Sequence, residues 1–284
     1  CENGQLDIIK YLMSLDDKPD IHAYNEEGFL WACHKGRLEV IKYLMLLEDK
    51  PNIHADDDFG FRSACRNGHL PVVEFLMLLE DKPNIHACDE QGFQWACKKG
   101  RLEVIKYLME QEDKPDIHAG NEHGFRYACE NEQLDIIKYL MSLDDKPDIH
   151  AENEKGFRYA CENGHSEVIK YLMSLEGKPN IHVNNEEGFL YACEHGHLNV
   201  IEYLMEQEDK PDIHVDNEQG FRMACFNGHL EVIKYLMEQE DKPDIHTVND
   251  CGFRWACGKG HLPVVEFLML LEDKPNIHVN NDEG

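Results

Sequence analysis

The sequence predicts an all-α solenoid, a stack of short helix-turn-helix repeats joined by finger or β-turn loops. Two observations predict this fold. Cysteine recurs every 32 residues without an insertion, at Cys1, Cys33, Cys65, Cys97, Cys129, Cys161, Cys193, Cys225 and Cys257. Within each period, apolar residues follow a helical stripe twice, and a Lys-Pro dipeptide then interrupts the pattern. A fixed period of this length is typical of stacked repeats, and we expect nine of them in one continuous array over residues 1–284.

The first helix of each unit is predicted from the spacing of its apolar residues. In the unit that starts at Gly124, the side chains of Phe125, Ala128 and Cys129 lie at i, i+3 and i+4, on one side of a helix. We expect this helix to end at about Glu130. A polar break follows, with glycine in most units, and turns the chain.

The second helix is predicted from about Leu134 to Asp144 by the same periodicity. Its expected apolar face consists of Leu134, Ile137, Tyr139, Leu140 and Met141. Asp135 and Lys138 are expected to face water. Pro147 lacks an N–H and ends any helix, so the stretch that follows is predicted to be an extended finger or turn that buries Ile149.

These segments resemble the ankyrin repeat family. NGHLEVIKYLM, from Asn227 to Met237, is similar to the family pattern GHLEVVKLLL of the second helix. The DIHA segment at residues 148–151 is similar to the DVNA finger, and FRYAC at residues 125–129 corresponds to LHLAA of the first helix. The resemblance covers the whole chain. Tetratricopeptide repeats have a nearby period, but they lack such a finger and need a longer first helix.

Two departures from the family pattern concern the loops. The Thr-Pro before the first helix is replaced by Glu26, Glu27 and Gly28, and the Gly-Ala after the second helix is replaced by a longer segment that ends in Lys18 and Pro19. Arrays without Thr-Pro are similar to those of giant DNA viruses of amoebae. The chain also starts and stops inside a unit without a polar capping repeat, so we expect it to be a fragment of a longer chain.

The charge of the chain limits its partners. There are 28 basic against 56 acidic side chains, a net charge of −28. Such a chain repels nucleic acid and anionic membrane surfaces, and no apolar run approaches the roughly 20 residues of a membrane-spanning helix. The acidic surface either serves solubility or attracts a basic protein partner, and both interpretations stay open.

A column of histidines poses the question of a metal site. It consists of His22, His54, His86, His118, His150, His182, His214, His246 and His278. Packed helices lie roughly 8–10 Å apart, whereas zinc ligands lie about 2 Å from one ion. We therefore expect no metal and no cofactor, and interpret the column as a ladder of hydrogen bonds between fingers.

The cysteine column is interpreted as buried packing, because a disulfide needs Cα atoms within about 7 Å of each other. Cys88 and Cys251 lie outside the column and are expected to be exposed and oxidisable. The chain has no Cys-x-x-Cys pair and no Asn-x-Ser/Thr sequon, which favours a reducing, cytoplasmic location.

No residues form a catalytic pattern, and we expect no enzyme. Asp58, Phe59 and Gly60 spell a kinase triplet without the other kinase motifs. Because carboxylates occur throughout the chain, we take paired acids to carry no information. The aromatic column consists of Trp31, Trp95, Tyr127, Tyr159, Tyr191 and Trp255. It is interpreted as packing between helices, with ligand stacking as the alternative.

Four columns vary between units and suggest where a partner binds. They are the residue after cysteine, the residue two after histidine, the residue before glycine, and the residue after Gly-Phe, which alternates arginine with Leu30, Gln94 and Leu190. The resemblance implies that the first three line the concave face of an ankyrin array and contact protein partners. The candidate residues are Tyr24, Glu27, His34, Asp56, Phe59, Arg66, Gln91, Lys98, His123, Glu152, Lys155, Asp216, Phe226 and Val248.

The expected function is a monomeric, non-enzymatic scaffold for protein–protein interaction. Apolar tips such as Tyr24, Phe59, Phe226 and Val248 would act as anchors, because such residues dominate binding energies. Neutral drift at exposed positions is an alternative origin of the variation. Two other functions stay open: the chain is the targeting or adaptor half of a larger effector, or it is a structural spacer. Residues 70–86 and 262–278 are identical, which suits recent duplication or a spacer.

Overall fold

The protein is all-helical, as predicted. A computed structural model describes residues 6–277, and this part of the chain contains 17 helices and no strand. It divides into two compact units, with the boundary between Asp148 and Ile149. Among the described residues, the first unit contains the single helix α1 and four helix pairs, and the second unit contains four helix pairs.

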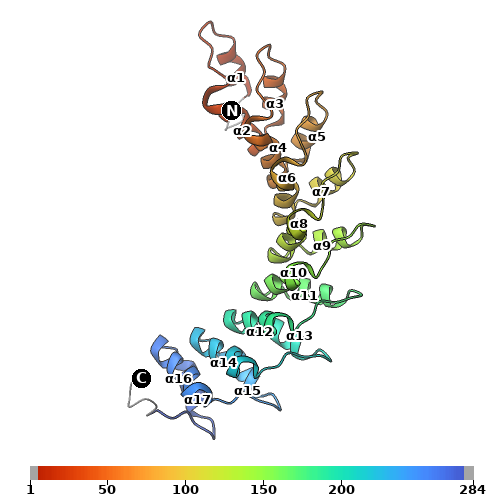
Figure 1. Ribbon diagram of the computed structural model, residues 1–284. Helices are drawn as coiled ribbons and strands as arrows, with labels where there is room; N and C mark the ends of the chain where they lie inside the picture. The colour runs from red at the N-terminus through yellow and green to blue at the C-terminus, as the bar shows by residue number, and fades with distance from the viewer. Residues whose placement is uncertain (1–5, 278–284) are drawn as a thin grey trace. The chain divides into compact units, whose positions relative to one another are not determined.

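The helices of the first unit alternate between longer and shorter segments. They are α1 (Leu6–Met13), α2 (Ala23–His34), α3 (Leu38–Met45), α4 (Ala55–Asn67), α5 (Leu70–Met77), α6 (Ala87–Lys98), α7 (Leu102–Met109), α8 (Ala119–Glu130) and α9 (Leu134–Met141). Within this unit the longer helices α2, α4, α6 and α8 stack on one another, and each packs against the shorter helix that follows it (Figure 1).

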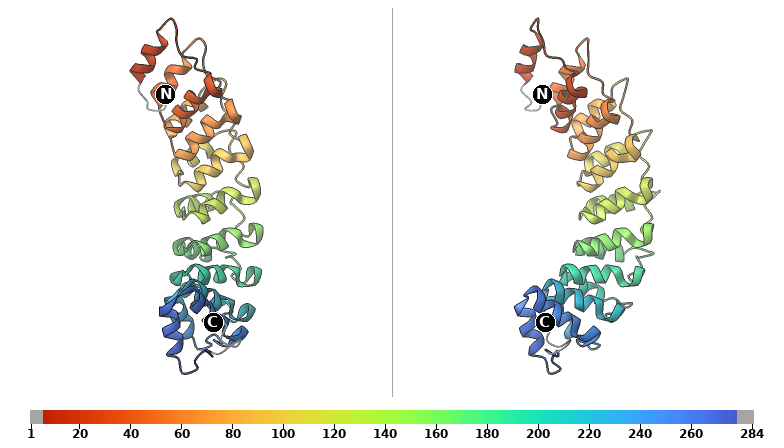
Figure 2. Two further views of the ribbon diagram at one scale, coloured as in Figure 1. Left: turned by 90° about the vertical axis from the view of Figure 1, so that its left-hand side faces the viewer. Right: turned by 60° about the vertical axis from the view of Figure 1, so that its left-hand side comes forward.

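The second unit repeats this order. Its helices are α10 (Ala151–Glu162), α11 (Ser166–Met173), α12 (Val183–His195), α13 (Leu198–Met205), α14 (Val215–Asn227), α15 (Leu230–Met237), α16 (Thr247–Lys259) and α17 (Leu262–Met269). Here α10, α12, α14 and α16 form the stack of first helices. The helices of each unit follow one another in sequence order in both turned views (Figure 2).

The core lies between successive first helices and the second helices beside them. Phe125 is 1% exposed, and Ala128 and Cys129 are fully buried, so the stripe predicted for the first helix is confirmed. A side chain is excluded at Gly124, because a Cβ atom there would lie 2.8 Å from Cε1 of Phe93 in the preceding repeat. The constant Gly-Phe pair therefore lets neighbouring first helices approach closely.

The second helix ends three residues earlier than predicted. α9 stops at Met141, where the backbone changes to shorter i→i+3 bonds: the N–H of Ser142 donates to the carbonyl of Tyr139 at 3.0 Å. The seryl hydroxyl donates to the same oxygen at 2.6 Å. The last turn therefore takes the tighter i→i+3 form, and the α-helix ends before Pro147 is reached. Ile149 is buried, as expected for the finger.

The first helix is entered through a left-handed turn that the sequence analysis did not predict. In α2, residues Tyr24, Asn25 and Glu26 have φ of 54°, 55° and 65°, and the right-handed helix begins only after them. Consecutive left-handed residues are costly without glycine, so contacts around the finger must hold them. The middle residue is asparagine or aspartate in every described finger, and these residues tolerate the left-handed region best.

Candidate functional site

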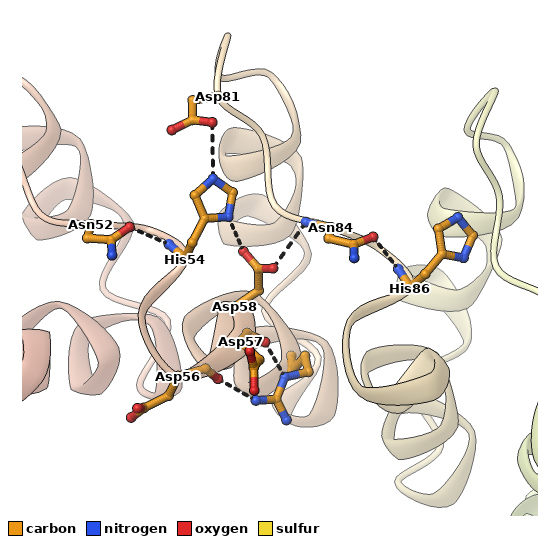
Figure 3. Close-up of polar contacts among 9 residues, drawn as sticks. Asn52, His54, Asp56, Asp57, Asp58, Asp81, Asn84 and His86 are labelled. Atoms are coloured by element: carbon orange, nitrogen blue, oxygen red, sulfur yellow. Dashed lines mark hydrogen bonds and ion pairs between the residues drawn. The ribbon is translucent and has the colours of Figure 1, made fainter.

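The constant residues of the finger form a ladder of carboxylates and histidines. At the start of α4, the Nδ1 atom of the N-cap residue His54 lies 2.7 Å from an oxygen of Asp58, the third left-handed residue (Figure 3). The Nε2 atom lies 3.1 Å from Asp81, which precedes the next finger. The other oxygen of Asp58 accepts the N–H of Asn84 at 3.3 Å. One imidazole thus connects a buried acid of its own repeat to an exposed acid of the next.

The same arrangement recurs along both units. The pairs of histidine and buried acid are His22–Glu26, His54–Asp58, His86–Glu90, His118–Glu122, His150–Glu154, His182–Glu186, His214–Glu218 and His246–Asp250, with N–O distances of 2.5–2.9 Å. Seven of the eight histidines also contact an aspartate of the next loop, and Gly177 stands at that place after His150. The predicted hydrogen-bond ladder is confirmed for the described histidines, and His278 lies outside them.

The ladder corrects the view that paired acids carry no information. Hydrogen bonds to Asp113 and Glu90 raise the pKa of His86 above its usual value, so the carboxylates favour its charged form. The pKa of Asp113 is lowered by the same contact. The missed signal is an acid that follows every column histidine by four residues.

The residue after Gly-Phe, here called the arginine position, supports the finger from the other side. Arg62 is buried, and its guanidinium donates to the carbonyl oxygens of Asp57 at 2.8 Å and Asp56 at 2.6 Å. It also donates to Gln91 of the next repeat. Its Cζ atom lies 5.6 Å from the ring centroid of its own Phe59 and 5.7 Å from that of Trp95. The charge is fully engaged inside the array.

Leucine replaces arginine in the preceding repeat, and a pocket of about 420 Å³ opens there between α2 and α4. We call it the Leu30 pocket. Besides Leu30 and Trp31, it is lined by Tyr24, Glu27, His34, Asp56 and Phe59. All of these last five are candidates from the variable columns. The structure therefore brings five predicted residues from two repeats into one site.

The walls of the Leu30 pocket combine aromatic surface with carboxylates. Tyr24 is 88% exposed and Trp31 is 37% exposed. Glu27 accepts the indole N–H of Trp31 at 3.4 Å, and Asp56 accepts the side-chain N–H of Asn25 at 2.6 Å.

His34 lines the pocket, and its surroundings favour the neutral imidazole. Burial lowers the pKa of His34, with Lys35 and Arg66 adding to the effect, and its Nδ1 lies 2.8 Å from the hydroxyl of Ser63. The Leu30 pocket is thus a hollow with acidic and aromatic walls and a histidine that favours its neutral form.

The other candidates of the first unit lie along the first helices and do not join this pocket. The Cζ atom of Arg66 lies 5.3 Å from the Trp95 ring centroid. The Nζ of Lys98 lies 4.5 Å from the Tyr127 ring centroid, and His123 stacks on the same ring at 4.1 Å. Gln91 is held by Arg62, as described above.

In the second unit, Glu152 pairs with Lys155 at 2.7 Å, and Asp216 accepts a hydrogen bond from Asn185 at 2.6 Å. Phe226 is half-buried rather than an exposed tip, and it packs edge-on against Trp255 with centroids 5.4 Å apart. Val248 is 49% exposed. These candidates are spread over several repeats.

The described cysteines are free thiols, and those of the column from Cys33 to Cys225 are buried. Cys257 of the column is exposed. Cys88 is exposed as expected, but the prediction for Cys251 is wrong, because it is 4% exposed. Cys251 directly precedes the Gly-Phe pair, and this position turns toward the preceding repeat, whereas Cys88 begins the left-handed turn and faces outward.

Within residues 6–277, no group of three or more histidine, cysteine, aspartate or glutamate side chains is arranged to hold a metal ion. In the same residues, every helix is too short or too polar to cross a bilayer.

Comparison with known proteins points to one family. A family model described as ankyrin repeats (three copies) matches residues 61–153, 125–217, 157–248 and 191–282. Together these matches cover well over half of the chain. Among solved structures, the chain is similar to an ankyrin repeat family protein from Legionella pneumophila, with 22% identity, 76% of this chain and 71% of that chain covered, and a TM-score of 0.39. No curated protein matches the chain.

Proposed function

Because the chain belongs to the ankyrin repeat family, whose repeats are generally non-catalytic protein–protein interaction modules, we propose that it is a scaffold that binds a protein partner. The partner docks on the fingers and first helices of a single continuous array over residues 1–284. The Leu30 pocket is the observation that supports this most, since residues from three variable columns meet there in one hollow. Variation at the wall of a pocket on a constant framework is what selection for a partner would produce.

The charge of the array indicates the character of the partner. With a net charge of −28, a basic protein is attracted and an acidic one is repelled, and such complementarity governs the rate and specificity of association. We propose that the array acts as a monomer without catalytic activity. The described cysteines all carry free thiols, which supports a reducing, cytoplasmic location.

Direct binding to the pocket tests the proposal. The intact chain, immobilised, would capture partners from a lysate, and each captured protein would be purified and its Kd measured by calorimetry. A double variant, Tyr24→Ser with Phe59→Ser, should weaken a true partner at least tenfold, because two aromatic contacts are lost. The matched control is Leu46→Ser with Leu78→Ser, two exposed apolar residues that directly follow second helices of the same unit and lie outside the variable columns, which should leave the Kd unchanged.

Two results would contradict the proposal. Equal affinity for the parent and the double variant would place the interaction elsewhere. If no captured protein binds directly after purification, the array would serve as a spacer, or as the targeting half of an effector whose partner is recognised by another part.

A further inference from the structure

We propose that the Leu30 pocket binds the guanidinium group of an arginine side chain presented by the protein partner. This inference rests on the proposed function and specifies its chemistry. The array itself contains the template for it, because its own arginines fill the corresponding place in other repeats.

The resident arginines show what the finger holds. In the second unit, Arg158 donates to the carbonyl oxygens of Asn153 at 2.8 Å and Glu152 at 3.1 Å, and it pairs with Glu187 of the next repeat at 2.6 Å. Arg222 makes the same two backbone contacts in its own repeat, at 2.8 and 2.9 Å. Its Cζ atom lies 5.7 Å from the Trp255 ring centroid. A guanidinium is thus held by two finger carbonyls, an acid or amide, and an aromatic face.

The Leu30 repeat has the same finger carbonyl groups but no arginine side chain to bind them. Tyr24 and Asn25 have the left-handed conformation of the other fingers, so their carbonyl groups stand where those of Asp56 and Asp57 receive Arg62. Leucine carries no donor and cannot bond to these oxygens. The pocket opens at this leucine.

The walls supply the remaining contacts. Glu27 and Phe59 occupy the positions before glycine in two successive repeats, the same positions that place Phe59 and Gln91 around Arg62. Asp56 adds a second carboxylate. A cation in this pocket would meet aromatic faces within cation–π distance and carboxylates that accept charge-assisted hydrogen bonds. Burial favours the neutral form of His34, which limits its repulsion of a cation.

Arginine fits this set of acceptors better than lysine. Its planar group presents five N–H donors in a fixed fork that can bond two carbonyls and a carboxylate while its face stacks on a ring. Lysine offers a compact charge with three donors and no planar face. Lys35 already approaches Trp31, with Nζ 5.4 Å from the ring centroid, so Phe59 and the two acids should contribute most of the selectivity.

Leu190 provides an internal contrast. It is the second leucine at the arginine position, but Glu187 there accepts the hydroxyl of Tyr191 at 2.7 Å and the amide of Asn184 at 2.8 Å. Gln219 stands at the place of Phe59. This site lacks the second ring and its acid is already engaged, so we expect it to bind guanidinium much more weakly.

The test uses a minimal probe, Nα-acetyl-arginine methylamide, titrated into the full chain. Binding would be followed through the indole N–H signal of Trp31 by NMR, assigned with a Trp31→Phe variant. We expect a saturable shift, and binding at least tenfold weaker for the lysine analogue and for Glu27→Gln combined with Asp56→Asn. The decisive variant is Leu30→Arg, which fills the pocket with the chain's own guanidinium and should abolish the shift.

The controls keep the test independent of folding. Arg62, Arg126, Arg158, Arg222 and Arg254 occupy the same position in their repeats, so Leu30→Arg is compatible with the fold. Leu30→Met preserves an apolar floor of similar volume and should retain binding. An unchanged titration with Leu30→Arg, equal binding of the lysine probe, or no saturable shift with the parent chain would each overturn the inference.

Failure of this inference is distinguishable from failure of the proposed function. A purified protein partner that binds the parent and Leu30→Arg equally leaves the scaffold function standing and removes the arginine. Conversely, a pocket that binds the arginine probe in a chain without any protein partner supports the site and contradicts the scaffold.

Discussion

The first unit contains two neighbouring interfaces between repeats, one at Leu30 and one at Arg62. They share the same framework, but one contains a pocket and the other is filled. Both have a left-handed finger, a buried phenylalanine and a histidine whose two ring nitrogens each contact a carboxylate. At Arg62 a guanidinium fills the space between repeats, and at Leu30 a pocket of about 420 Å³ remains. One side chain therefore decides whether an interface is an internal contact or a potential docking site.

The largest effect should come from the framework that the two interfaces share. Phe29 and Phe61 are each 1% exposed, and replacing either with alanine should lower the free energy of unfolding by about 3–5 kcal/mol. Urea denaturation followed by circular dichroism measures both losses. A much smaller loss for Phe29→Ala than for Phe61→Ala would mean that the two frameworks are not equivalent.

A smaller effect should come from converting one interface into the other. Arg62→Leu removes charge-assisted hydrogen bonds to the carbonyl groups of Asp56 and Asp57, and should lower the free energy of unfolding by about 2 kcal/mol. Leu30→Arg should leave stability unchanged or raise it, since it adds the same contacts. The two variants are compared in one denaturation series, and a stability loss of similar size in both would refute the equivalence of the two positions.

The smallest effect concerns pH and should be the same at both interfaces. Hydrogen bonds to carboxylates raise the pKa of His22 and His54 in the folded state. Their contribution to stability is therefore complete below a pH of about 6.5, the ordinary histidine value, and is lost as pH rises through the higher folded-state pKa. These histidines should therefore make the array less stable as the pH rises above about 6.5.

NMR titration of the histidine ring signals checks this response residue by residue. Asp49→Asn should move the pKa of His22 down toward its ordinary value, and Asp81→Asn should do the same for His54. Because Glu26 contributes most to the raised pKa of His22 and Asp81 contributes most to that of His54, the change should be larger at His54, and a larger change at His22 would contradict this ranking.

The architecture could be predicted from the sequence because the period repeats one local pattern many times. Phe125, Ala128 and Cys129 lie on a single helical stripe, and only a buried face explains why the stripe returns without change. The end of the second helix at Met141 was misjudged, since the side-chain pattern continues while the backbone already changes its hydrogen bonding.

The sequence predicted residues of the site but not the pocket that they form together. Variation identified Tyr24, Glu27 and Phe59, but nothing in a list of variable columns indicates which residues share a pocket. The exchange of arginine for Leu30 was noted as variation, and its meaning depends on finger carbonyls that only a left-handed backbone places around the guanidinium. The buried acid at Glu26 went unnoticed in a chain rich in carboxylates.

The first helices from α2 to α14 each contain a buried column cysteine, whereas Cys257 of α16 is exposed. Burial raises the pKa of Cys65, Cys97 and their equivalents, so a thiolate forms only when the surrounding repeat opens to water. Under an alkylating reagent, the modification rate of each cysteine peptide would then report the opening frequency of its own repeat. The native cysteines therefore allow the local opening of individual repeats to be compared along the chain, without introducing a label.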